Sequence, residues 1–197
     1  MLDQFVGGGT TLIEAKLLNR NIIGVDVNPA ALQRCREKCN FSYKGDSRVY
    51  IKEGDARNLN FIPSSSIDFV CTHPPYADII KYSEGIKEDI SHLSEKKFLL
   101  AMNQVAEESF RVLKSHKYCA ILMGDMRKNG RVVSLGFEVM QEFQKAGFVL
   151  KEIIIKEQHH CKSTIYWKKK SKKYNFLLLA HEYLFVFEKG GYDGILL

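Results

Sequence analysis

The fold is decided by residues 1–28, which read MLDQFVGGGTTLIEAKLLNRNIIGVDVN. Residues 1–5 have the character of a short strand that enters a glycine turn, and residues 10–19 place apolar side chains at helical spacing. Residues 21–26 form an apolar run that ends in an acid, which is typical of a buried strand. A strand, a helix and a second strand in this order predict the first unit of a parallel sheet.

The alternation continues along the chain. Asn28 is a suitable N-cap, and Pro29 a suitable first residue, for a helix that runs to about Cys39. Further strands are predicted at residues 49–53, 67–72, 118–123, 148–156 and 182–188, and further helices at 95–113 and 133–146. Because no helix long enough for a crossover separates the last two strands, we expect them to pair antiparallel. The expected fold class is therefore α/β, with a mostly parallel sheet and helices on both faces.

Length and composition are those of an ordinary globular domain. With 197 residues and 45% hydrophobic content, the chain fits a single domain over residues 1–197. No apolar run approaches the roughly 18 residues of a membrane-spanning helix, and the N-terminus lacks the pattern of a secretory signal. The five cysteines are odd in number and scattered, which favours a reducing, cytoplasmic location.

The net charge of +6 is concentrated in one segment. Residues 156–174 contain seven lysines and one acid, so the rest of the chain is neutral. Lysines that are clustered with aromatic side chains fit a nucleic-acid backbone, although a solvated loop explains the same residues equally well. The candidate nucleic-acid-binding residues, within an insertion at about residues 156–181, are Lys162, Trp167, Lys168, Lys169, Lys170, Lys172 and Lys173.

Polar residues follow the first four predicted strands. They are the glycine loop at residues 7–11, Asp26, Asp55 and the turn at residues 73–76. In sheets of this kind, ligands bind beyond the carboxyl ends of the strands. We therefore expect these four clusters to form one site.

The glycine loop favours a nucleoside ligand without phosphates. It lacks the glycine at position 12 that a dinucleotide fingerprint needs, and no Gly-Lys-Ser/Thr follows it. Asp26 lies about 20 residues further on, where a carboxylate can accept both hydroxyls of a ribose. Asp55 could accept an adenine amino group beside the Ala56 amide. Either acid could instead serve as a helix cap or turn residue.

The turn His73-Pro74-Pro75-Tyr76 is the most informative of the four clusters, because it could hold an exocyclic amine. Two prolines remove two amide donors, so carbonyl oxygens are left to accept. Tyr76 offers a face on which a base can stack, and neutral His73 offers one acceptor nitrogen. Accepting both hydrogens of an aromatic amine frees its lone pair for attack on a methyl donor. A proline-stiffened turn is the alternative explanation.

No metal is needed for this chemistry, and none is expected. Cys35 and Cys39 are four residues apart on a predicted helix, without a second ligand pair at zinc spacing. His159, His160 and Cys161 are adjacent, which is a poor geometry for holding one ion.

The sequence resembles the S-adenosylmethionine-dependent DNA amino-methyltransferases of the adenine-N6 and cytosine-N4 type. Residues 3–11 are similar to the family loop Asp-Pro-Phe-x-Gly-x-Gly-Thr-Thr, and residues 73–76 to the turn (Asp/Asn/Ser)-Pro-Pro-(Tyr/Phe/Trp). Residues 111–114 and 123–127 are also similar in kind, so the resemblance spans roughly residues 1–188. It implies a Rossmann-like class I methyltransferase fold with a seven-stranded sheet and S-adenosylmethionine as the cofactor.

The resemblance also implies roles for individual residues. The target amine and base would be held by His73, Pro74, Pro75 and Tyr76. The cofactor would be held by Asp3, Phe5, Gly7, Gly9, Thr10, Thr11, Asp26, Asn28, Asp55 and Ala56.

Three features depart from the family pattern. Gln4 replaces proline, and His73 replaces Asp, Asn or Ser, which removes the simplest indication of the target base. The chain also begins on the first strand, so a segment that walls the methionine end of the pocket could be missing or supplied by a partner chain.

Three functional hypotheses follow. The first is methyl transfer to the exocyclic amine of adenine or cytosine in DNA. The second keeps the chemistry but has RNA as the substrate. The third is a degenerate methyltransferase fold that serves as a nucleic-acid-binding subunit.

Overall fold

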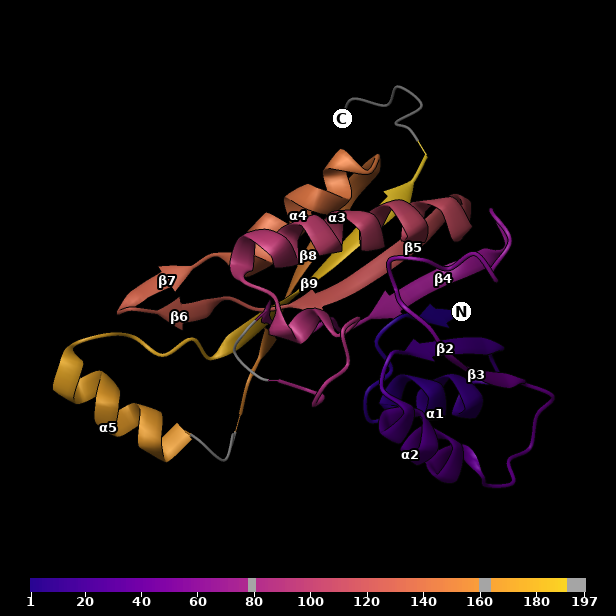
Figure 1. Cartoon of the computed structure of the whole chain (residues 1–197), viewed down its shortest axis with the longest axis horizontal. Helices are drawn as coiled ribbons and strands as arrows, with labels where there is room; N and C mark the ends of the chain where they lie inside the picture. The colour runs from indigo at the N-terminus through magenta and orange to yellow at the C-terminus, as the bar shows by residue number, and fades with distance from the viewer. Residues whose placement is uncertain (78–80, 160–163, 191–197) are drawn as a thin grey trace.

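The computed structural model describes residues 1–77, 81–159 and 164–190. Its centre is a seven-stranded sheet with the order β3-β2-β1-β4-β5-β9-β8 (Figure 1). These strands are β1 (Leu2–Asp3), β2 (Ile22–Asp26), β3 (Val49–Glu53), β4 (Ile67–Thr72), β5 (Leu113–Met123), β8 (Phe148–Glu157) and β9 (His181–Lys189). Strands β1 to β5 pair in parallel, whereas β9 is antiparallel to both β5 and β8. The predicted α/β class, with its antiparallel terminal pair, is confirmed.

Helices cover both faces of the sheet (Figure 1). They are α1 (Thr10–Leu17), α2 (Pro29–Cys39), α3 (Glu95–Val112) and α4 (Leu135–Lys145), whereas α5 (Thr164–Tyr174) projects away from the sheet. Helices α1 and α2 enclose one core around Leu12 and Leu32. Helices α3 and α4 enclose a larger core around Phe98 and Phe143. No described helix is long and apolar enough to cross a membrane.

Strand β2 serves both cores because its side chains alternate between the two faces. Ile22 packs in the core under α1 and α2, and Val25 packs in the core under α3 and α4. A Cβ atom on Gly24 would lie 2.7 Å from side-chain carbons of both Leu12 and Val6. Glycine therefore lets α1 pack tightly on β2, which brings the glycine loop beside the end of this strand.

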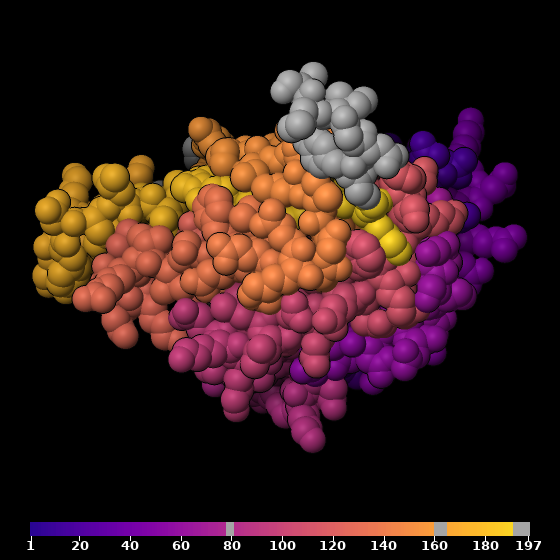
Figure 2. All heavy atoms as spheres, turned by 90° about the horizontal axis from the view of Figure 1, so that it is seen from above, coloured from indigo at the N-terminus to yellow at the C-terminus, as the bar shows by residue number. Residues whose placement is uncertain are grey.

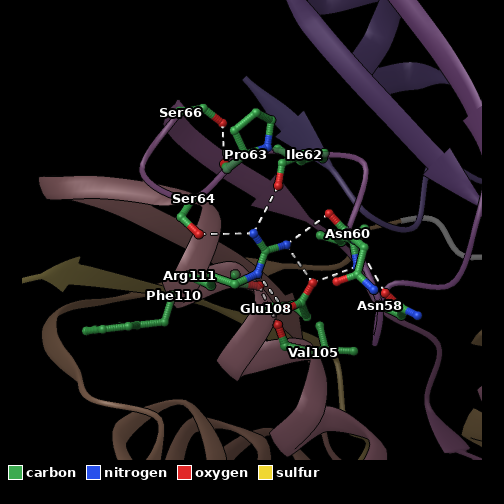
Figure 3. Close-up of polar contacts among 12 residues, drawn as sticks. Asn58, Asn60, Ile62, Pro63, Ser64, Ser66, Val105, Glu108, Phe110 and Arg111 are labelled. Carbon is green, nitrogen blue, oxygen red and sulfur yellow. Dashed lines mark hydrogen bonds and ion pairs between the residues drawn. The ribbon is translucent and has the colours of Figure 1, made fainter.

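An arginine clamp holds the connection between β3 and β4, the segment that begins with Asp55 (Figure 3). The Arg111 guanidinium donates to the carbonyl oxygens of Ile62 and Leu59, both at 2.9 Å. Glu108 pairs with Arg111 at 2.7 Å and accepts from the Leu59 amide at 2.6 Å. The end of α3 is thereby tied to the connection that leads away from the β3 side of the site.

Three elements in the described part of the chain were not predicted, and the shortest is the 3₁₀ helix η2 (Ile90–His92). The connection between β8 and β9 contains the 11-residue helix α5, where we expected no helix of that length. A small hairpin of β6 (Met126–Lys128) and β7 (Arg131–Val133) follows β5, and Asn129 and Gly130 turn it with φ of 51° and 77°. Helix α5 and this hairpin protrude at the same end of the molecule (Figures 1 and 2).

Two strand lengths also differ from the prediction. β1 ends at Asp3 instead of Phe5, because the Asp3 carboxylate accepts from the Phe5 amide and turns the chain. β5 begins at Leu113 instead of Tyr118.

Candidate functional site

A cavity of about 470 Å³ opens at the carboxyl ends of β1, β2, β3 and β4. It brings together residues from all four predicted clusters. The predicted residues that line it are Asp3, Phe5, Gly7, Thr10, Thr11, Asp26, Asn28, Asp55, Ala56, His73, Pro74 and Pro75. Gly9 and Tyr76 are the predicted catalytic or cofactor residues that do not line it.

Asp26 ties the glycine loop to the end of β2. Its Oδ2 accepts from the Gly7 amide and its Oδ1 from the Asn28 amide, both at 2.9 Å. Burial raises the pKa of Asp26, although these amide hydrogen bonds oppose the shift. Each carboxylate oxygen has a second lone pair, so the group can still accept from a ribose diol.

Asp55 is held by a close neighbour. The Arg57 guanidinium donates from Nε to both carboxylate oxygens at 3.0 Å and from Nη2 at 2.6 Å. This pairing raises the pKa of Arg57. Asp55 therefore lies in the predicted place, but its carboxylate is oriented and partly neutralised by Arg57. The buried Ala56 lines the cavity beside it.

The start of the glycine loop is buried. The Asp3 Oδ1 accepts from the Thr72 hydroxyl at 2.7 Å and from the Phe5 amide at 3.1 Å, and burial raises the pKa of Asp3. Gln4 stands where the family pattern has proline. Its Oε1 accepts from the Ser109 hydroxyl on α3 at 3.0 Å. The side chain of this substitution thus joins the glycine loop to the helix behind it.

The charge of the lining fits a cationic nucleoside. The acidic residues are Asp3, Asp26, Asp55, Glu88 and Asp89, and the basic residues are Arg34 and Arg57. S-adenosylmethionine carries a sulfonium and an ammonium group against one carboxylate. An excess of carboxylates around a buried pocket stabilises such a ligand, and the glycine loop allows its backbone to approach closely.

Part of the lining had no predicted role in holding the cofactor. Tyr82, Glu88, Asp89 and Ile90 come from the segment that follows the His73–Tyr76 turn. Asn28, besides capping α2, donates from Nδ2 to the Tyr82 carbonyl oxygen at 3.1 Å. No motif marks these four residues. The pairing of Arg57 with Asp55 could have been predicted, because Arg57 lies two residues after Asp55 in the sequence.

Gly9 acts through packing and backbone geometry. It caps α1 with φ of 82°, and a Cβ atom there would lie 3.0 Å from the Cys35 sulfur on α2. Burial raises the pKa of the Cys35 thiol to about 11, so it remains protonated. Gly9 thus shapes the loop from behind the cavity.

Tyr76, the last residue of the turn, is anchored through its hydroxyl group. Its hydroxyl donates to the Glu182 Oε1 on β9 at 2.7 Å and lies 2.9 Å from the His73 Nε2. Glu182 is buried and also accepts from the Lys156 Nζ on β8 at 2.8 Å. The His73–Tyr76 turn is therefore connected to the strand pair β8–β9, which α5 joins.

The pKa values of this group have distinct causes. Burial would raise the pKa of Glu182, but hydrogen bonds from Lys156, Tyr76 and Gln158 outweigh it and hold the pKa below its usual value. Burial and the Glu182 carboxylate raise the pKa of Tyr76. Burial lowers the pKa of His73, with Glu182 opposing and Lys156 adding to the shift. At neutral pH, Glu182 is ionised while Tyr76 and His73 are neutral.

Six of the seven predicted nucleic-acid-binding residues lie on α5, away from the cavity. This helix contains five lysines and no acid, and Tyr166, Trp167 and Tyr174 are exposed on it. The Lys170 Nζ lies 4.7 Å from the Tyr166 ring centroid. None of the described α5 residues lines the cavity, and Lys162 lies outside the described residues.

The β6–β7 hairpin contacts the segment that follows α5. The Arg127 guanidinium stacks over the Phe176 ring at 4.5 Å and donates to the Leu177 carbonyl oxygen at 3.1 Å. Figure 2 shows the two elements side by side at one end of the molecule.

Two family models match the chain. The N6/N4 DNA methylase model, described as "DNA methylase", matches residues 67–193, and a general methyltransferase-domain model matches residues 1–94. Among curated proteins, the type II methyltransferase M.MjaI of Methanocaldococcus jannaschii is 27% identical over 175 residues, which is 70% of this chain and 54% of that protein. The tRNA (guanine(10)-N2)-dimethyltransferase of Pyrococcus abyssi is 32% identical over 77 residues, which is 39% of this chain and 23% of that protein. The chain thus spans about half or less of these relatives.

Solved structures show the same fold. An S-adenosylmethionine-dependent methyltransferase from Methanosarcina mazei superposes with a TM-score of 0.64 at 14% identity, covering 95% of this chain and 91% of that one. A DNA modification methylase homologue from Thermus thermophilus, complexed with S-adenosyl-L-methionine, gives a TM-score of 0.51 at 27% identity over 73% of this chain and 56% of that one. The chain therefore belongs to the N6/N4 DNA methylase family and has the class I fold of S-adenosylmethionine-dependent methyltransferases.

Proposed function

We propose that this chain is a single catalytic domain that transfers a methyl group from S-adenosylmethionine to the exocyclic amine of adenine (N6) or cytosine (N4) in DNA. The observation that carries the proposal is the position of the His73-Pro74-Pro75 turn in the wall of the acidic cavity. This arrangement puts acceptors for an amine beside a pocket that suits the methyl donor.

The cofactor would be held along the four strand ends. Asp26 would accept from the ribose hydroxyls, and the Asp55–Ala56 segment would face the adenine ring. Thr10 and Thr11, at the start of α1, would lie near the methionine carboxylate, where the helix N-terminus favours an anion. S-adenosylmethionine supplies the electrophilic methyl group.

The turn would activate the target amine. His73 and a proline-turn carbonyl would each accept one amine hydrogen, and Tyr76 would stack on the extruded base. The amine nitrogen then bonds to the methyl carbon as the carbon–sulfur bond breaks, and the electron pair of that bond stays on sulfur. The methylated amine finally loses one proton, for which the neutral His73 is the nearest base in the turn.

Helix α5 would contact the nucleic-acid backbone outside the cavity. Its five lysines supply charge, and Trp167 and Tyr174 supply exposed rings on which bases can stack. Extruding a base costs a few kcal/mol and costs least in single strands, so a compact basic arm of this size suits a flexible or partly opened substrate.

A second substrate has support of its own. The tRNA guanine-N2 dimethyltransferase of Pyrococcus abyssi shares 32% identity over 77 residues, and it also acts on an exocyclic amine. RNA is therefore the competing substrate class, and the chemistry of the turn would be unchanged.

Competition between substrates tests the proposal. We would incubate the protein with methyl-labelled S-adenosylmethionine and an equimolar mixture of single-stranded DNA, duplex DNA and tRNA, and then identify labelled nucleosides by mass spectrometry. The proposal expects label in N6-methyladenine or N4-methylcytosine of DNA. Label in tRNA guanine alone would support the RNA function. Tight DNA binding without cofactor binding would indicate a nucleic-acid-binding subunit.

A further inference from the structure

The buried carboxylate of Glu182 links the His73–Tyr76 turn to the neighbouring strand β8. It comes from β9, 106 residues from Tyr76 in sequence, and joins the catalytic turn to the Lys156 ammonium on β8. It does not line the cavity. A direct contact between His73 and Glu182 is too long for a hydrogen bond, since Nε2 and Oε1 are 3.7 Å apart. The charge of Glu182 acts on the His73 ring directly, but any hydrogen-bonded influence of Glu182 on His73 passes through Tyr76.

The direction of each hydrogen bond from Lys156 to His73 follows from the number of protons that each group carries. The ionised Glu182 only accepts, and Lys156 only donates, so the single proton of the Tyr76 hydroxyl points to Glu182. The Tyr76 oxygen can then only accept from His73, whose Nε2 lies 2.9 Å away. Neutral histidine carries one ring proton, and this contact places it on Nε2. The Nδ1 is left as a bare acceptor with no partner among the described residues.

We propose that Glu182 is a positioning residue that sets the tautomer of His73 through Tyr76, so that Nδ1 is free to accept from the target amine. The opposite tautomer would present an N–H donor to an amine that also donates. The effect on catalysis rests on the proposed function, whereas the tautomer itself does not. Glu182 also orients the Tyr76 ring, because the same hydrogen bond anchors its hydroxyl.

The isosteric variant Glu182→Gln inverts the chain of hydrogen bonds. Lys156 can only donate, so it would donate to the amide oxygen of the new glutamine. The amide nitrogen of that glutamine would then face the Tyr76 hydroxyl. The Tyr76 proton would then point to the His73 Nε2, and the ring proton of His73 would move to Nδ1. Tyr76→Phe removes the link altogether, so His73 should populate both tautomers.

Nitrogen NMR measures the tautomer directly. Long-range ¹H–¹⁵N spectra of histidine-labelled protein distinguish protonated from bare ring nitrogens, and the His73 signal is assigned from its loss in His73→Asn. His92 is an internal control, because its Nε2 lies 2.8 Å from the Ser83 carbonyl oxygen and must donate in every variant. We expect Nε2–H at His73 in the native protein and Nδ1–H in Glu182→Gln.

Activity gives a second readout. Methyl transfer by Glu182→Gln should fall at least about tenfold, while its affinity for S-adenosylmethionine stays within about twofold of the native value. An Nδ1–H tautomer in the native protein, or an unchanged tautomer in both variants, overturns the proposal. If the tautomers behave as expected but the native protein methylates no nucleic acid, the positioning holds and the proposed function fails.

Discussion

The substitution Asp26→Asn tests how the cofactor is held. Asp26 accepts from two backbone amides, those of Gly7 and Asn28, through different oxygens at 2.9 Å each. Asparagine keeps the shape of the side chain but replaces one carboxylate oxygen by an NH₂ group. One of the two backbone amides then loses its acceptor, and the ribose also loses one acceptor. A hydrogen bond to a charged group contributes about 1.5–3 kcal/mol. At about 1.4 kcal/mol per tenfold change, the dissociation constant for S-adenosylmethionine should rise about 10- to 150-fold.

Isothermal titration calorimetry measures this change. Glu53→Gln is a matched control, since Glu53 pairs with Asp26 in the β2–β3 register but does not line the cavity. Its affinity should stay within about twofold of the native value. Circular dichroism would establish that both variants are folded. A folded Asp26→Asn variant that binds the cofactor as tightly as the native protein would refute the assignment of Asp26 to the ribose.

Three further predictions concern other parts of the chain. Gly24→Ala places a Cβ atom 2.7 Å from buried carbons of Leu12 and Val6, so overpacking should cost about 1–3 kcal/mol in denaturant unfolding, whereas Gly8→Ala, with no atom nearer than 3.8 Å, should cost less. Because burial lowers the pKa of His73 and the acceptor is the neutral form, kcat/KM should fall on acidification with a midpoint below pH 6.5. Alanine substitution of the lysines at 168–173 should reduce the salt dependence of DNA binding by about 0.9 for each phosphate contact that is lost.

Each of these has a contrary outcome. Equal unfolding free energies for Gly24→Ala and Gly8→Ala would show that α1 can move away from β2 without cost. An acid limb centred above pH 7, or one that persists in His73→Asn, would assign the titration to another group. A salt dependence that does not change would remove α5 from the DNA interface.

The sheet and the cavity could be predicted because they follow from local patterns. Each strand of the first half contains apolar residues and ends in a polar residue, and parallel pairing brings all the ends to one edge. The glycine loop, Asp26, Asp55 and the proline turn therefore converge in the structure as expected. Their individual roles in binding and catalysis stay predictions.

The missed elements lack such patterns. Helix α5 has no buried apolar face, because its residues project from the sheet and its lysines are solvated. The strands of the β6–β7 hairpin have three residues each, too few for an alternation to be recognised. Asn129-Gly130 is nevertheless a recognised hairpin-turn signal and could have been used.

Contacts between segments that are distant in the sequence could not be predicted either. Glu182 and Tyr76 meet only because β9 inserts between β5 and β8, and nothing near Glu182 in the sequence marks it as a partner of the turn. Tyr82 and Asp89 reach the cavity through the path of an irregular segment after β4. Such residues are set by tertiary packing and not by local periodicity.

Methyl transfer by the native protein and by His73→Ala is the most direct test of the central claim. Both would be incubated with methyl-labelled S-adenosylmethionine and DNA, and the labelled nucleosides would be identified by mass spectrometry. The proposed site predicts N6-methyladenine or N4-methylcytosine with the native protein, and a loss of label of about a hundredfold or more with the variant. Equal label from both proteins, or none from the native protein, would contradict it.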